Sequence, residues 1–93
     1  MIDFPPTKSL LKKTRQSKFK NVVGALVKEA RLDRRAPVSQ EDFSGRLARV
    51  GVHISQTGIS KLEARERYVM DYEVLAISRV LRVPLSWLYG IKE

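Results

Sequence analysis

Cysteine is absent from this chain of 93 residues, and histidine occurs only once. Without cysteine there is no disulfide framework, no thiol redox chemistry and no cysteine-containing zinc site. The one histidine, His53, lies in a segment that we expect to be a loop, and it has no partner at metal-ligand spacing. We therefore predict no metal centre, and the lack of disulfide-forming residues favours a reducing cytoplasm as the location.

A long hydrophobic run is also missing. The N-terminal region is basic, and the only apolar pair that follows, Leu10 and Leu11, sits among charged residues. A signal peptide needs an apolar core of roughly 7 to 15 residues and a membrane helix needs about 20, so we predict neither. We expect a soluble protein that stays inside the cell.

Signatures of catalysis are absent as well. The chain has no nucleophile elbow, no glycine-rich phosphate loop and no pair of acids arranged for general acid–base chemistry. Glu41, Asp42 and Glu63 are better explained as helix-capping or ion-pairing residues. We predict that the protein is not an enzyme and that it uses no cofactor.

Positive charge is what the sequence has in excess. Lys and Arg number 18 against 10 Asp and Glu, which gives a formal net charge of +8 at pH 7. An excess of this size indicates an anionic partner. Nucleic acid and an acidic membrane surface both fit, and an incidental surplus of surface cations is the plain alternative. The sequence favours nucleic acid over a membrane surface, because the basic N-terminal segment lacks the large apolar face of a membrane-surface helix.

The length of the chain allows one domain with a tail. Residues 1–18 hold two prolines and five cations but little apolar material to bury, and we interpret them as a flexible basic arm. The arm could wrap a nucleic acid or could be a solvated leader, and the sequence leaves both open. Residues 19–93 form the predicted domain.

Apolar residues recur at helical spacing in several short segments, which are separated by proline, glycine or polar breaks. We expect a first helix over about 19–32, followed by helices that start at Ser39, Ser55, Asp71 and Pro84, the last ending near Gly90. No segment has the alternating pattern of a strand. The predicted fold is all-α, a compact bundle of about five short helices.

Two of these helices lie close together within Ser39–Glu63, and the second has an unusual composition. Its apolar residues point one way, whereas amide, hydroxyl and ammonium groups point the other. A helix fits the major groove of B-DNA, where Gln can bond adenine, Lys can reach guanine and the Thr methyl can touch thymine. Because side chains near the start of such a helix come closest to the bases, we expect Gln56 and Thr57 to read bases, with Lys61 one turn later.

The stretches Ser39–Phe43 and Ile59–Glu63 resemble the signature of the phage repressor/Cro-type, or XRE-like, family of helix-turn-helix proteins. The resemblance runs from about Asn21 to Gly90 and includes the residues of the first helix and of the closing helices. It implies a lambda-repressor-like DNA-binding domain. It also implies a transcriptional regulator, most simply a repressor, that binds double-stranded operator DNA in the cytoplasm, at the nucleoid.

The resemblance further implies roles for individual residues. Phosphate contacts are expected from Ser39, Gln40, Ser55, Ser60, Arg65 and Arg67. Gln40 would also brace the recognition helix, and Arg31 and Glu63 would pair inside the domain, tying the first helix to the third. Arg65 and Arg67 could alternatively belong to a solvated connection after the recognition helix.

The sequence departs from the family pattern at three places. The stretch Ala48–Ile54 is several residues longer than the usual tight turn, so either the second helix is extended or the turn loops outward. Ser44 stands where a small Ala is usual. Gly58 lies inside the recognition helix, where it costs roughly 1 kcal/mol relative to Ala, so it either permits a close approach of the backbone or is merely tolerated.

The family resemblance implies a homodimer whose two recognition helices enter successive major grooves roughly 34 Å apart. If residues 85–91 make the dimer contact, an apolar patch of Leu85, Tyr89 or Ile91 should remain exposed in the monomer. Two other functions remain open at this point. The protein could be the antitoxin of a toxin–antitoxin pair that uses the same DNA-binding domain, or a basic adaptor that holds an acidic protein without reading DNA.

Overall fold

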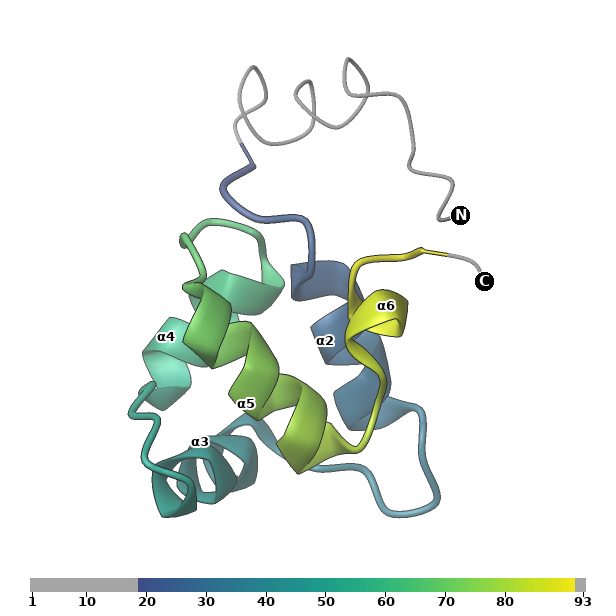
Figure 1. Cartoon of the computed structure of the whole chain (residues 1–93). Coiled ribbons are helices and arrows are strands. Elements are labelled where there is room, and N and C mark those ends of the chain that lie inside the picture. Colours follow the sequence, from purple (N-terminus) through teal and green to yellow (C-terminus); the bar gives the residue numbers. More distant parts are fainter. Residues whose placement is uncertain (1–18, 92–93) are drawn as a thin grey trace.

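The computed structural model describes residues 19–91, and the predicted arm 1–18 lies outside the described residues. The described chain is all-helical and contains, in order, α2 (Gly24–Leu32), α3 (Gln40–Arg49), α4 (Gln56–Glu63), α5 (Asp71–Leu81) and α6 (Leu85–Leu88). In Figure 1, α5 crosses the middle of the molecule, with α3 and α4 on one side and α2 and α6 on the other. The predicted all-α bundle of about five short helices is confirmed for this part of the chain.

The first helix begins later than the apolar spacing predicts. That spacing predicts a helix from about residue 19, whereas α2 begins at Gly24. The side chain of Asn21 explains the difference, because its Oδ1 accepts the backbone N–H of Gly24 at 2.8 Å. An asparagine oxygen that binds the backbone three residues ahead is a typical helix-starting contact, so the preceding residues take a non-helical path.

The last two helices differ from prediction by one residue at their starts. Asp71 is predicted as the cap of the fourth helix, but Met70 holds the N-cap position and the Glu73 carboxylate accepts the Met70 N–H at 2.9 Å. Pro84 is predicted inside the first turn of the last helix and is instead the N-cap of α6. Such shifts lie within the usual variation of helix boundaries.

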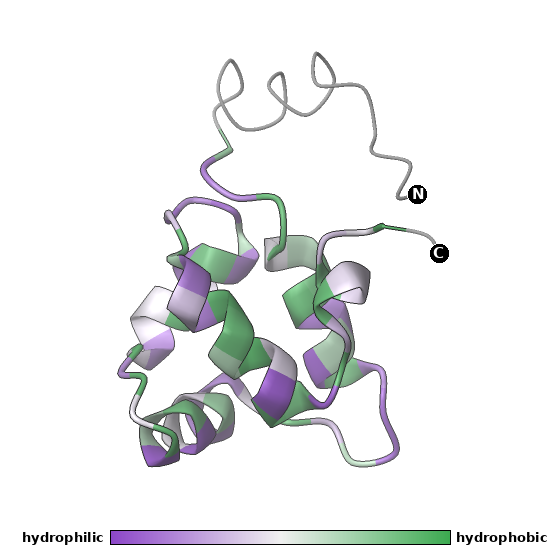
Figure 2. Ribbon diagram, in the orientation of Figure 1, coloured by the Kyte–Doolittle hydropathy of each residue, from purple (hydrophilic) through white to green (hydrophobic). Residues whose placement is uncertain are grey.

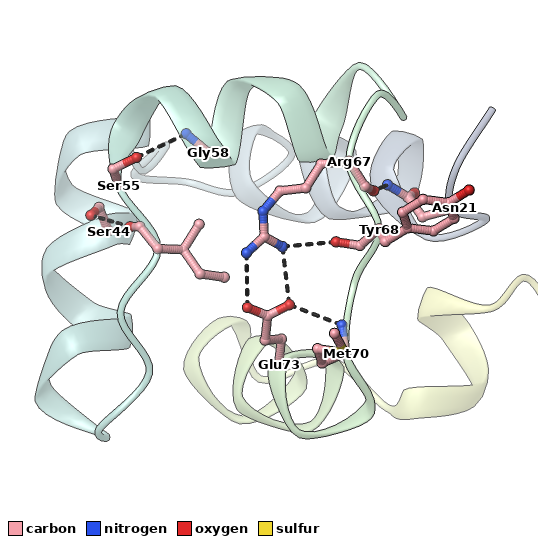
Figure 3. A network of polar contacts seen from close by, with 9 residues as sticks. Asn21, Ser44, Ser55, Gly58, Arg67, Tyr68, Met70 and Glu73 are labelled. Carbon is pink, nitrogen blue, oxygen red and sulfur yellow. Dashed lines mark hydrogen bonds and ion pairs between the residues drawn. The ribbon is translucent and has the colours of Figure 1, made fainter. Parts of the chain in front are cut away.

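The starts of α3 and α4 are fixed by two serines, as the sequence indicates. Ser39 Oγ accepts the backbone N–H of Asp42 at 3.0 Å, and Ser55 Oγ accepts that of Gly58 at the same distance. Figure 3 shows the second of these bonds. Each bond satisfies an amide that the helix itself leaves without a partner, and it fixes which residues of the helix face inward.

A single hydrophobic core lies where the helices meet, and Figure 2 shows the central turns of α5 coloured as hydrophobic. The largest fully buried side chains are Phe43, Leu47, Ile59, Leu62, Ile77, Leu81, Leu88, Val23 and Val27. α4 packs against both α2 and α3. The polar helix α4 is therefore anchored by its few apolar residues.

The last helix contributes one fully buried residue to the core. Leu88 is fully buried, whereas Trp87 is only partly buried against the core and Leu85 is 42% exposed. α6 has a single turn, so only one of its residues reaches the centre of the bundle.

Candidate nucleic-acid interface

One face of α4 consists of exposed polar side chains. Ile59 and Leu62 are fully buried on the opposite face. The side chains of Gln56, Thr57 and Lys61, predicted to read bases, are all exposed to solvent, as are those of Ser55 and Ser60. This arrangement leaves an amide, hydroxyls and an ammonium group accessible on a short rigid helix.

The segment between α3 and α4 is long and is tied down at its end. α3 continues to Arg49, so that residues 50–55 form the connection. Ser44 Oγ donates a hydrogen bond to the Ile54 carbonyl oxygen at 2.6 Å, which Figure 3 shows beside the Ser55 cap. Ile54 itself is 4% exposed. The hydroxyl of Ser44 therefore attaches α3 to the chain directly before α4.

Gly58 lies close to its neighbours, which leaves little room for a side chain. A Cβ atom placed on Gly58 would lie 3.0 Å from Ile54 Cγ2 and 3.4 Å from Ser55 Oγ. Ile54 is part of the core and the Ser55 hydroxyl is already bonded to the Gly58 N–H, so neither neighbour moves away easily. Glycine therefore suits the crowded first turn of α4, although its helix propensity is lower than that of other residues.

The inner side of α4 carries a buried ion pair. Arg31 Nε lies 2.7 Å from Glu63 Oε2, and Arg31 Nη2 donates to Glu63 Oε1 at 2.9 Å. The two side chains are 7% and 3% exposed. Gln40 Nε2 donates to the same Glu63 Oε1 at 3.1 Å, and Arg31 Nη1 donates to the Val38 carbonyl at 2.7 Å. One carboxylate therefore connects α2, α3 and α4, in the arrangement that the family resemblance implies.

Arg67 is engaged inside the domain. Its Nη1 and Nη2 donate to the two carboxylate oxygens of Glu73 at 3.0 and 2.9 Å, and Nη1 also donates to the Tyr68 carbonyl at 3.0 Å (Figure 3). The hydrogen bond from Arg67 lowers the pKa of Glu73, against the opposing effect of burial. Arg67 is predicted as a phosphate contact, but both ends of its guanidinium fork already bind a carboxylate.

The backbone of Arg65 has a left-handed conformation, with φ of 65°. Its N–H donates to the Leu62 carbonyl at 3.0 Å, and the N–H of Glu66 donates to the Lys61 carbonyl at 2.8 Å. Glycine usually occupies this position at the end of a helix, because other residues lose roughly 1 kcal/mol there.

The side chains of Arg65 and Lys20 form a small basic cluster at the end of α4. The guanidinium carbon of Arg65 lies 3.9 Å from the centre of the Phe19 ring, and Arg65 Nε donates to the Asn21 carbonyl at 3.2 Å. The exposed Lys20 has its Nζ 5.4 Å from the centre of the Tyr68 ring. Arg65 and Lys20 are thus both held next to the last turn of α4.

Three residues that bind α4 or the segments directly before and after it are not found by reasoning from the sequence. Ser44 is noted there only as a departure from the family pattern. Asn21 could have been recognised as a capping residue, since it stands three positions before Gly24. Glu73 gives no such signal, because the N-cap residue that it binds is a methionine.

Residues 19–91 contain neither a membrane-spanning helix nor a candidate metal site. No helix there is both long enough and apolar enough to cross a membrane. The same residues contain no cluster of His, Cys, Asp and Glu side chains that could hold a metal ion, and His53 is exposed in the connection before α4.

Comparison with known proteins gives no match to a family model, to a curated protein or to a solved structure.

Proposed function

We propose that this protein is a helix-turn-helix transcriptional regulator that binds double-stranded DNA in a sequence-specific manner. In this proposal α3 and α4 form the helix-turn-helix, and α4 is the recognition helix. The observation that carries the proposal is the composition of α4, whose Ile59 and Leu62 are fully buried while Gln56, Thr57 and Lys61 face solvent. These three side chains match the edges of adenine, thymine and guanine in the major groove.

Contacts to phosphate are assigned to the residues around the recognition helix. The proposed set contains Ser39, Gln40, Ser55, Ser60 and Arg65, and it leaves out Arg67. Ser39 and Ser55 lie at the starts of α3 and α4, where the helix dipole and backbone N–H groups favour an anion. Arg65 adds a full positive charge at the other end of α4. Neutralising phosphates in this way makes binding strongly dependent on salt.

The strained backbone of Arg65 allows the phosphate role to be tested by substitution. We expect Arg65→Gly to change the free energy of unfolding by less than about 1 kcal/mol, since relief of the left-handed strain offsets the lost contacts with the Phe19 ring and the Asn21 carbonyl. Affinity for DNA should fall several-fold, and the dependence of log K on log salt should become shallower by about one unit. Titrations by fluorescence anisotropy at several salt concentrations measure both quantities.

The matched control is Arg82→Gly. Arg82 also has a left-handed backbone, with φ of 57°, and lies at the end of α5. Its replacement removes the same charge and relieves the same kind of strain, so we expect a gain in stability of up to about 1 kcal/mol and unchanged DNA binding. Equal losses of affinity in the two variants would show that only net charge matters.

An apolar patch supports the homodimer that the family resemblance implies. It surrounds a groove between α5 and α6 and includes Tyr72, Leu75, Leu85 and Tyr89, which are 60%, 40%, 42% and 45% exposed. Two of its members, Leu85 and Tyr89, are among the residues expected to form the contact, whereas Ile91 is only partly exposed. A two-fold dimer through one such patch suits an operator with two half-sites.

We expect Leu75→Lys to convert the proposed dimer to a monomer, because a charged side chain in the patch cannot be buried without a partner. Sedimentation velocity measures the change, and operator binding should weaken in parallel. Leu32→Lys is the control, since Leu32 is 43% exposed at the end of α2 and is not a residue of the patch. A wild-type chain that stays monomeric at high concentration, with and without DNA, would contradict the dimer.

The proposed function as a whole is tested by selecting binding sites from a pool of random DNA duplexes at near-physiological salt. A regulator should enrich one motif, and a dimer should enrich two copies of it with fixed spacing. Weak enrichment without a common sequence would instead indicate a basic adaptor or a protein that binds DNA without sequence preference.

A further inference from the structure

Asn21 is a buried polar residue that belongs neither to the proposed DNA contacts nor to the proposed dimer patch. It lies in the segment before α2 and is only 6% exposed. A buried side-chain amide is costly unless its donors and its acceptor are all bonded. In this protein they are. Oδ1 accepts the Gly24 N–H at 2.8 Å, and Nδ2 donates to the carbonyl oxygens of Leu62 at 3.1 Å and Arg67 at 2.8 Å.

These bonds join the segment before α2 to the end of α4. Leu62 lies in the last turn of α4, and Arg67 lies in the connection that follows; Figure 3 shows the bond from Asn21 to Arg67. The carbonyl of Asn21 accepts a hydrogen bond from Arg65 Nε at 3.2 Å, and the N–H of Lys20 donates to the Arg65 carbonyl at 2.9 Å. Residues far apart in the sequence therefore hold one end of the helix.

The contact leaves little freedom for α4 to shift. A Cβ atom on Gly24 would collide with the Leu62 carbonyl oxygen, so the first turn of α2 lies directly against the last turn of α4. Starting α2 does not by itself require asparagine, since Ser and Asp are equally good acceptors at a helix start. Only an amide can accept one bond and also donate two. The two donors therefore point to a role beyond capping α2.

We propose that Asn21 is a positioning residue for the DNA-reading face of α4. It fixes the last turn of α4 and the connection after it, and it acts without touching DNA itself. This inference rests on the proposed function. If the two donors are lost, α4 spends less time in the orientation that binds DNA, and the apparent affinity falls in proportion to that fraction.

The test uses Asn21→Ser in the full-length chain. Serine keeps the acceptor for Gly24 but removes both amide donors. The control is Ile77→Val, a core substitution on α5 that lowers stability and leaves the hydrogen-bonding groups of Asn21 and its partners in place. Both variants are measured at a temperature where more than about 95% of the chain is folded, so that differences in stability do not enter the binding data.

Two measurements are made on each variant. The first is the ratio of affinities for the selected operator and for a scrambled duplex. We expect this ratio to fall about tenfold in Asn21→Ser and to stay unchanged in Ile77→Val. The second is amide hydrogen exchange, which should become faster at residues 63–68 in Asn21→Ser, whereas in Ile77→Val any change should spread over the whole domain.

Either of two results overturns the positioning role. One is an affinity ratio in Asn21→Ser equal to that of Ile77→Val, and the other is unchanged exchange at residues 63–68. Failure of the proposed function gives a different result, since the wild-type chain itself would then not distinguish the operator from the scrambled duplex. Hydrogen exchange needs no DNA. If the proposed function fails, unchanged exchange in Asn21→Ser would therefore still show that Asn21 does not hold the end of α4 in place.

Discussion

Replacing Gln56 and Lys61 together by Ala should remove most of the preference of the protein for the DNA sequence that it selects. Each bidentate base contact contributes about 1–3 kcal/mol of discrimination, so the double variant should lose roughly 100-fold or more in the ratio of specific to non-specific affinity. Both side chains are exposed, and the substitutions should change the free energy of unfolding by no more than about 0.5 kcal/mol. Anisotropy titrations with the selected operator and with a scrambled duplex measure the ratio.

The charge removed with Lys61 requires its own control. Lys28→Ala removes one exposed charge from α2, which holds none of the proposed DNA contacts, and should lower affinity for both duplexes only slightly and equally. If the double variant discriminated the operator as well as the wild-type chain does, α4 would not read bases. A protein partner would then be the better explanation of the exposed face of α4.

Glu63→Ala should be among the most destabilising single substitutions in the protein. It leaves Arg31, whose side chain is 7% exposed, buried without its carboxylate partner, and breaking such a pair costs about 3–5 kcal/mol. A domain of this size has a total stability of only about 5–15 kcal/mol, so much of the variant could be unfolded at 37 °C. Urea unfolding followed by circular dichroism measures the loss, with the protein concentration held constant because the proposed dimer would also contribute.

Removing both charges distinguishes the cost of one unpaired buried charge from the net contribution of the ion pair to stability. The double variant Arg31→Met, Glu63→Met should be more stable than Arg31→Met or Glu63→Met alone, because no buried charge is left without a partner. Gln40 loses its bond to Glu63 in that variant, so the start of α3 should still be perturbed. A loss of less than about 1 kcal/mol in Glu63→Ala would show that Arg31 finds another partner or reaches water.

Much of the fold could be predicted from the sequence because it depends on local patterns. The serine caps at residues 39 and 55 and the apolar spacing within α3 and α4 are short-range signals, and the structure has both helices where these signals place them. The exposure of Gln56, Thr57 and Lys61 follows from the same spacing, since Ile59 and Leu62 must face the core. Their role in reading DNA stays a prediction.

The connections between distant segments could not be predicted in this way. The late start of α2 depends on Asn21, whose amide is buried only because the chain after α4 lies across it. The engagement of Arg67 depends on Glu73, which the fold of the following connection brings near. From the sequence alone Arg67 is one of several exposed cations, and nothing in its neighbours distinguishes it from Arg65.

The sequence by itself determined the helical class, the two serine-capped helices and the polar side chains that α4 presents, because each depends on residues within one or two turns of one another. The pairing of Arg31 with Glu63 is implied by the family resemblance, whereas tertiary structure alone decided the other two contacts that hold α4, from the amide of Asn21 and the hydroxyl of Ser44. The physical reason is that a buried polar group needs a partner, and the chain supplies these partners from segments far away in the sequence.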